Sequence, residues 1–136
     1  MGALRDAHLP AGEKSMKKIL IVDDRPAVRE LVSVTLEIGP YQILSAEDGD
    51  QALEIARAEL PELILLDIQM PGSLDGLEVC RILKNDERTK DIYIVMLTAK
   101  GQDWDRQAGQ EAGADDYFVK PFSPLELINK VEAVLG

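Results

Sequence analysis

Three aspartates stand where apolar runs of strand length end, which makes them the residues best placed for chemistry. Asp67 closes the apolar run 63–66, and Asp23 and Asp24 close the run 19–22. The carboxyl ends of strands in an open parallel sheet meet in one crevice. We therefore expect the three carboxylates to form a single acidic pocket.

An acidic pocket of this kind needs a compensating positive charge. Two like charges about 4 Å apart repel by roughly 4 kcal/mol at an effective dielectric near 20. Oxygen ligands of this hardness suit Mg²⁺ or Mn²⁺, and Mg²⁺ usually takes one or two carboxylates, keeps several waters and works beside phosphate. The pocket thus predicts a magnesium cofactor, with manganese as a substitute, and phosphoryl transfer as its chemistry.

The elements that must position these aspartates alternate between short apolar runs and helical stripes. Pro26 suits the first turn of a helix that carries apolar residues at helical spacing as far as Leu36. Ser123 and Glu126 have the spacing of a capping box at the start of the last helix. Strands are expected at 19–22, 41–46, 63–67, 92–97 and 117–119, and the other helices at 48–60, 76–85 and 103–112.

Five strand–helix units with nearly all-apolar strands predict an α/β fold. Crossovers between parallel strands are right-handed, so the strands form one doubly wound parallel sheet with helices on both faces. Residues 1–16 lack apolar periodicity and are expected to be a tail or a remnant of cloning, whereas residues 17–136 form one domain.

Composition narrows the possible partners and locations. The 25 acidic and 15 basic residues give a net charge of −10, which argues against direct binding to nucleic acid or to an anionic membrane. The single cysteine, Cys80, cannot form an internal disulfide. No apolar run approaches the roughly 18 residues that a membrane-spanning helix needs. We expect a soluble, cytoplasmic protein.

A set of motifs in a fixed order gives the chain a family resemblance. The motifs are Asp23-Asp24, Asp67-Ile68-Gln69-Met70-Pro71, Asp75-Gly76, Leu97-Thr98-Ala99, Gly113-Ala114-Asp115-Asp116-Tyr117 and Lys120-Pro121-Phe122. Over residues 17–136 the chain resembles the receiver domain of two-component response regulators, with one extra residue between Pro71 and Asp75. The resemblance implies a flavodoxin-like sheet order 2-1-3-4-5, in a receiver that either stands alone or belongs to a longer protein.

The resemblance also implies a role for each acidic residue. Asp67 would accept a phosphoryl group from a phosphohistidine of a sensor kinase or phosphotransfer protein. Asp24, Asp67 and the backbone carbonyl of Gln69 would bind Mg²⁺ directly, and Asp23 would act through a coordinated water. The domain would catalyse its own phosphorylation and dephosphorylation, without being an enzyme in the conventional sense.

Further residues would stabilise and report the phosphorylated state. Lys120 supplies a fixed cation, held by a cis Lys120–Pro121 bond, and Thr98 supplies a hydroxyl donor. Thr98 and Tyr117 would act as a switch that alters the surface of the fourth helix, fifth strand and fifth helix, where a downstream protein or a fused output domain binds. Gln69 and Lys100 would tune the lifetime of the phosphoryl group.

Single residues of these motifs could also have purely structural roles. Two other functions of the domain also remain open from the sequence. Taken alone, the Asp23-Asp24 pair could be a helix cap, Thr98 an ordinary strand-end residue and Lys120 a solvated charge. The domain could be a receiver-like interaction module without phosphoryl turnover. A Mg²⁺-dependent phosphatase with an aspartate nucleophile is disfavoured, because Asp23-Asp24-Arg25 lacks the Asp-x-Asp pattern of that class.

Overall fold

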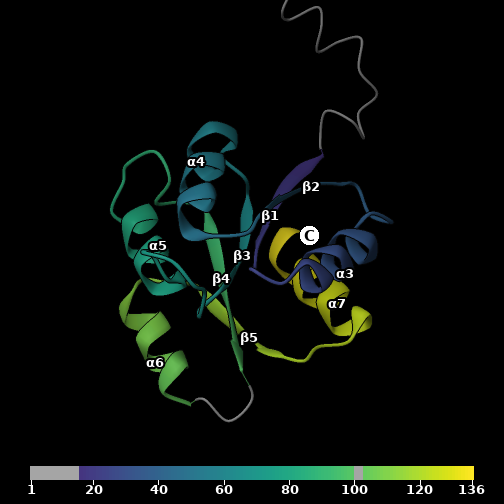
Figure 1. Cartoon of the computed structure of the whole chain (residues 1–136). Helices are drawn as coiled ribbons and strands as arrows, with labels where there is room; N and C mark the ends of the chain where they lie inside the picture. The colour runs from purple at the N-terminus through teal and green to yellow at the C-terminus, as the bar shows by residue number, and fades with distance from the viewer. Residues whose placement is uncertain (1–15, 100–102) are drawn as a thin grey trace, which may run out of the picture.

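The computed structural model, which describes residues 16–99 and 103–136, confirms the predicted α/β fold and the predicted strand order (Figure 1). All strand pairs are parallel, and the order across the sheet is β2-β1-β3-β4-β5. The strands are β1 (Lys17–Val22), β2 (Tyr41–Ala46), β3 (Leu63–Asp67), β4 (Tyr93–Ala99) and β5 (Asp116–Lys120). The helices of the described segments are α3 (Pro26–Leu36), α4 (Gly49–Glu59), α5 (Gly76–Lys84), α6 (Asp103–Glu111) and α7 (Pro124–Leu135).

Helices cover both faces of the sheet, as Figure 1 shows: α3 and α7 lie on one face, and α4, α5 and α6 lie on the other. Alternate residues of each central strand therefore enter different cores. Ile19 and Leu65 pack with α3 and α7, whereas Leu20 and Leu66 pack with the three other helices. This double burial explains why β1 and β3 read as continuous apolar runs.

Side-chain caps set most of the helix starts. Asp48 caps α4 by accepting a hydrogen bond from the Gln51 backbone, so this helix begins one residue later than predicted. The predicted capping box of Ser123 and Glu126 is present at the start of α7, and a second one at α5 pairs Asp75 with Glu78. These caps fix where each loop leaves the sheet.

The register of the sheet brings the ends of β3, β4 and β5 to one edge. Asp67 is the partner of Leu97 across β3 and β4, and Ala99 is the partner of Lys120 across β4 and β5. Residues far apart in the sequence therefore meet at the carboxyl edge of the sheet. Throughout the two described segments, every helix is too short or too polar to cross a lipid bilayer.

Candidate functional site

The structure gathers the three predicted acidic residues at this edge. Asp23, Asp24 and Asp67 each place one carboxylate oxygen within 4.8 Å of the others. Asp23 is fully buried and Asp67 is 4% exposed, whereas Asp24 is open to solvent. The two buried carboxylates lie where the adjacent strands β1 and β3 end, and the open one leaves the cluster accessible.

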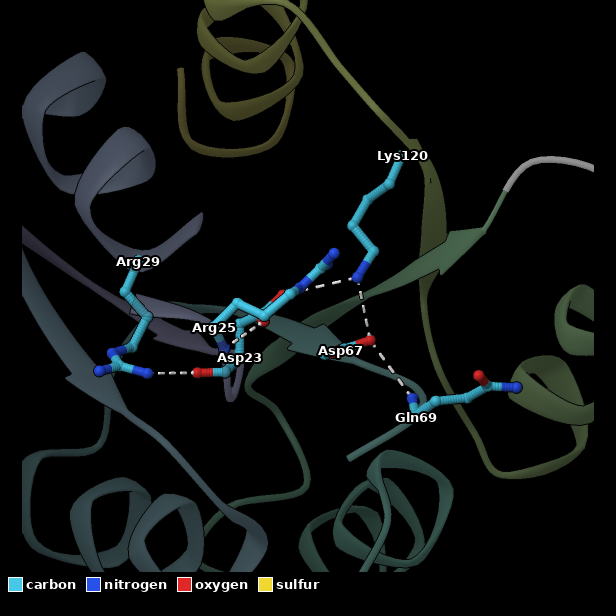
Figure 2. A network of polar contacts seen from close by, with 6 residues as sticks. All are labelled: Asp23, Arg25, Arg29, Asp67, Gln69 and Lys120. Carbon is cyan, nitrogen blue, oxygen red and sulfur yellow. Dashed lines mark hydrogen bonds and ion pairs between the residues drawn. The ribbon is translucent and has the colours of Figure 1, made fainter. Parts of the chain in front are cut away.

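Lys120 points into this acidic cluster from the end of β5 (Figure 2). Its ammonium nitrogen lies 3.2 Å from Asp67 Oδ1, to which it donates a hydrogen bond, and 3.5 Å from Asp23 Oδ2. The Lys120–Pro121 peptide bond is cis, as predicted. Lys120 is therefore a half-buried partner of both carboxylates and not a solvated surface charge.

Two arginines that belong to none of the predicted site motifs also contact Asp23. The backbone N–H of Arg25 donates to Asp23 Oδ1 at 2.9 Å, and its Nε lies 3.4 Å from the same oxygen. Arg29 donates to the Asp23 backbone carbonyl at 2.8 Å (Figure 2). The hydrogen bond to Asp23 raises the pKa of the Arg25 guanidinium above its usual value. Their positions two and six residues after Asp23, around a helix start, were the only signal in the sequence.

The donor set fits a hard divalent cation. Asp23 Oδ2 is buried and has no hydrogen-bond donor within the described part of the chain, since Lys120 approaches it as an ion pair only. A buried carboxylate oxygen without a donor is costly, and a cation supplies the missing partner. Three carboxylate oxygens within one small volume are ligands that Mg²⁺ prefers.

The environment of Asp67 opposes its negative charge in the metal-free state. Burial raises the pKa of the Asp67 carboxyl; the charge and hydrogen bond of Lys120 oppose this effect, and the charge of Asp23 adds to it. The Gln69 backbone N–H also donates to Asp67 Oδ1, at 3.3 Å. The net direction is upward, so the ionised form of Asp67 destabilises the folded protein when no metal is present.

The raised pKa of Asp67 predicts a pH dependence of stability in the presence of a chelator. The stabilising contribution of Asp67 is complete below its unfolded-state pKa, near 3.9, and is lost as the pH rises through the higher folded-state pKa. Asparagine does not titrate. The free energy of unfolding of Asp67→Asn should therefore rise relative to that of the parent as the pH increases through this window.

Denaturant unfolding of both proteins between about pH 4 and pH 8 measures this difference. Saturating Mg²⁺ should reverse it at neutral pH, because the cation binds the ionised carboxylate of the parent more strongly. A difference between the two proteins that stays constant with pH would contradict a raised pKa for Asp67.

A cleft of about 480 Å³ opens directly onto Asp67. Polar groups from Asp24, Arg25, Gln69 and Lys120 line one part of it, and the rest is lined by Val28, Leu31, Ile68, Ala99, Pro121 and Phe122. The predicted residue Thr98 is buried and lies next to Ala99, one position beyond the β4 partner of Asp67. The side chain of Gln69 is exposed at the rim.

Tyr117 lies apart from the cleft, on the opposite face of the sheet. Its ring packs against the core under α4, α5 and α6, and the Arg106 guanidinium carbon stands 4.0 Å from the ring centroid. Arg106 also hydrogen-bonds to the Tyr117 hydroxyl. The structure therefore does not bring Tyr117 to the acidic cluster, and Lys100 lies outside the described residues.

Comparisons with known proteins agree on one family. The family model of the response regulator receiver domain matches residues 19–132. The phosphate regulon transcriptional regulatory protein PhoB of Pseudomonas aeruginosa is 50% identical over 119 residues, which are 88% of this chain and 52% of that protein. The DNA-binding dual master transcriptional regulator RpaA of Synechocystis is 46% identical over 120 residues, with 88% and 49% coverage.

Solved structures give the same answer for the fold. A putative response regulator from Chloroflexus aurantiacus superposes with a TM-score of 0.83 at 37% identity, covering 89% of this chain and 98% of that one. The chemotaxis response regulator CheY4 of Vibrio cholerae gives 0.82 at 33% identity, covering 88% and 99%. The chain spans about half the length of the two curated relatives.

Proposed function

Because the chain belongs to the response regulator receiver family, we propose that it accepts a phosphoryl group on Asp67 and thereby changes its affinity for a protein partner. One observation carries this proposal: Asp67 lies in an acidic cluster at the floor of an open cleft, 3.2 Å from the ammonium of Lys120. A nucleophile, a fixed cation and access for a donor are thus combined in one place.

The chemistry follows from the position of Asp67. A carboxylate oxygen of Asp67 forms a bond to phosphorus while the bond between phosphorus and the donor nitrogen breaks, and the product is an acyl phosphate. The imidazole of the donor leaves with the electron pair of the broken bond and needs no proton from Asp67. The domain thus catalyses its own modification by positioning and by electrostatics.

Lys120 stabilises the charge that moves during this transfer. In a loose in-line transition state, negative charge lies on the equatorial oxygens of the phosphoryl group. The Lys120 ammonium already stands beside Asp67 and is held there by two carboxylates, so it needs little reorganisation. Thr98, at the end of the neighbouring strand, supplies a hydroxyl donor to the same oxygens.

Receiver domains in general bind Mg²⁺, and we assign the site here to Asp23, Asp24, Asp67 and the backbone carbonyl of Gln69. When bound, the ion neutralises the acidic cluster and the charge of the incoming phosphoryl group. The unpartnered oxygen of Asp23 and the solvent-open position of Asp24 support this assignment. Mn²⁺ has the same preference for oxygen ligands and is expected to substitute.

The partners follow from the family and from the relatives. Receiver domains interact with kinases and with output domains, so we assign a sensor kinase or a phosphotransfer protein as the donor. The relatives named as transcriptional regulators are about twice as long as the matched region. The receiver would therefore signal to a fused output domain or a separate protein, and would not bind nucleic acid directly.

Thr98 and Tyr117 are proposed as the switch between the two states. Movement of Thr98 toward the phosphoryl group would free space beside β4 for the Tyr117 ring. That ring is held at present by Arg106 of α6, so its movement would alter the surface of α6, β5 and α7. Gln69 at the rim of the cleft, together with Lys100, would set how fast water removes the phosphoryl group.

A direct experiment tests the proposal. The chain is incubated with acetyl phosphate and Mg²⁺, and its intact mass is measured. One phosphoryl group per chain is expected with Mg²⁺, and none with a chelator. No gain of mass, even with a kinase supplied, would favour an interaction module without phosphoryl turnover. Steady turnover of phosphate esters that survives Asp67→Asn but not Asp23→Ala would favour the phosphatase class.

A further inference from the structure

Arg25 is a second cation at the acidic cluster, placed on the cleft side of Asp23. Its Nε lies 3.4 Å from Asp23 Oδ1, and its side chain lines the cleft together with Asp24 and Asp67. Figure 2 shows that Arg25 and Lys120 both reach the carboxylates. Unlike Lys120, which is largely buried, the Arg25 side chain is 55% exposed and has room to move.

The backbone around Arg25 fixes where its side chain begins. Arg25 is the residue before α3, and its carbonyl accepts hydrogen bonds from Val28 and Arg29. Its own N–H is held by Asp23 Oδ1. The side chain therefore starts beside the cluster in any rotamer, and only its outer part is free to leave.

The charges at the cluster suggest what Arg25 does. Three carboxylates face two cations, Lys120 and Arg25, so the metal-free cluster is already largely neutralised from within the chain. A divalent ion that enters this space meets the repulsion of both cations. Lys120 is needed beside the nucleophile Asp67, whereas the ion pair of Arg25 is with Asp23.

We infer that Arg25 is an internal counter-cation of the acidic cluster, which occupies Asp23 in the metal-free protein and lowers the affinity of the site for Mg²⁺. This inference rests on the proposed function and adds a control of metal affinity to it. Because Arg25 is more than half exposed, its effect is that of a screened ion pair, worth a two- to fivefold change in the Kd of Mg²⁺ at about 0.1 M salt.

Calorimetric titration with Mg²⁺ tests the inference on three variants. Arg25→Gln should lower the Kd of Mg²⁺ by about two- to fivefold, and the gain should shrink in about 1 M salt, where charges are screened within about 3 Å. Arg25→Lys keeps the charge and should stay close to the parent. Arg57→Gln is the matched control. It removes the same charge in the last turn of α4 and should not change the Kd of Mg²⁺.

The outcomes separate the inference from the proposed function. If the parent binds Mg²⁺ and Arg25→Gln binds it equally or more weakly, the inference is overturned and the proposed function stands. An equal gain in Arg57→Gln would also overturn it, because the effect would then come from net charge. If Arg25→Lys behaves like Arg25→Gln, the inference is also overturned, because the effect would come from the shape of Arg25 and not from its charge. A parent that binds no Mg²⁺ would remove the proposed function itself.

Discussion

Replacement of Asp67 by asparagine abolishes uptake of a phosphoryl group from acetyl phosphate, in the largest change of activity that we expect. An amide lacks the negative charge of a carboxylate, and its oxygen is too weak a nucleophile to form the bond to phosphorus. Asparagine matches the shape of aspartate, so the fold should persist. Removal of a buried charge whose pKa is raised should even stabilise the metal-free protein.

Intact-mass measurement in the presence of Mg²⁺ checks this loss, and Asp91→Asn is its control. Asp91 is exposed at the other end of the sheet, before β4, and its replacement makes the same acid-to-amide change. The control should gain one phosphoryl group as the parent does. A full gain of mass in Asp67→Asn would show that another residue accepts the phosphoryl group, and Asp24 would be the next candidate.

The positions of the buried carboxylates were predictable because the carboxyl ends of parallel strands always lie at the same edge of the sheet. Asp23 and Asp67 end apolar runs of neighbouring parallel strands, and the carboxyl ends of such strands meet at one edge, which places the two carboxylates in the same crevice. Lys120 was predictable only through its motif, since its ammonium reaches Asp67 through the pairing of β4 with β5.

Contacts made by long side chains on helices, or next to a helix start, could not be predicted in the same way. Arg25 and Arg106 each have several rotatable bonds, and no pattern in the sequence states which neighbour they choose. In the structure Arg25 hydrogen-bonds to Asp23, and the Arg106 guanidinium packs over the Tyr117 ring. Helix ends also differ by about one residue from the prediction, because a capping side chain such as Asp48 lies outside the helix it starts.

Gly76 is a position where the structure shows a steric requirement of the site. A Cβ atom at this residue would lie 2.1 Å from the Asp67 carbonyl oxygen and 2.8 Å from the Ile68 Cα atom. Both neighbours are backbone and cannot rotate away. The Gly76 N–H also donates to the Ile68 carbonyl at 3.1 Å, which holds the start of α5 against the end of β3. Any side chain at position 76 must therefore displace the backbone of Asp67.

Gly76→Ala should accordingly lower the free energy of unfolding by about 3 kcal/mol or more, the upper range for overpacking. Denaturant unfolding measures this loss, and calorimetry should show weaker Mg²⁺ binding, because Asp67 moves with its backbone.

Gly109→Ala is the matched control within a helix. Its Cβ would meet the flexible Met96 side chain at 3.2 Å and the Ala114 Cβ atom at 4.0 Å, and alanine favours helix by up to about 1 kcal/mol. Equal stability of the two variants would contradict close packing between the start of α5 and the end of β3. The position of Asp67 would then need another explanation.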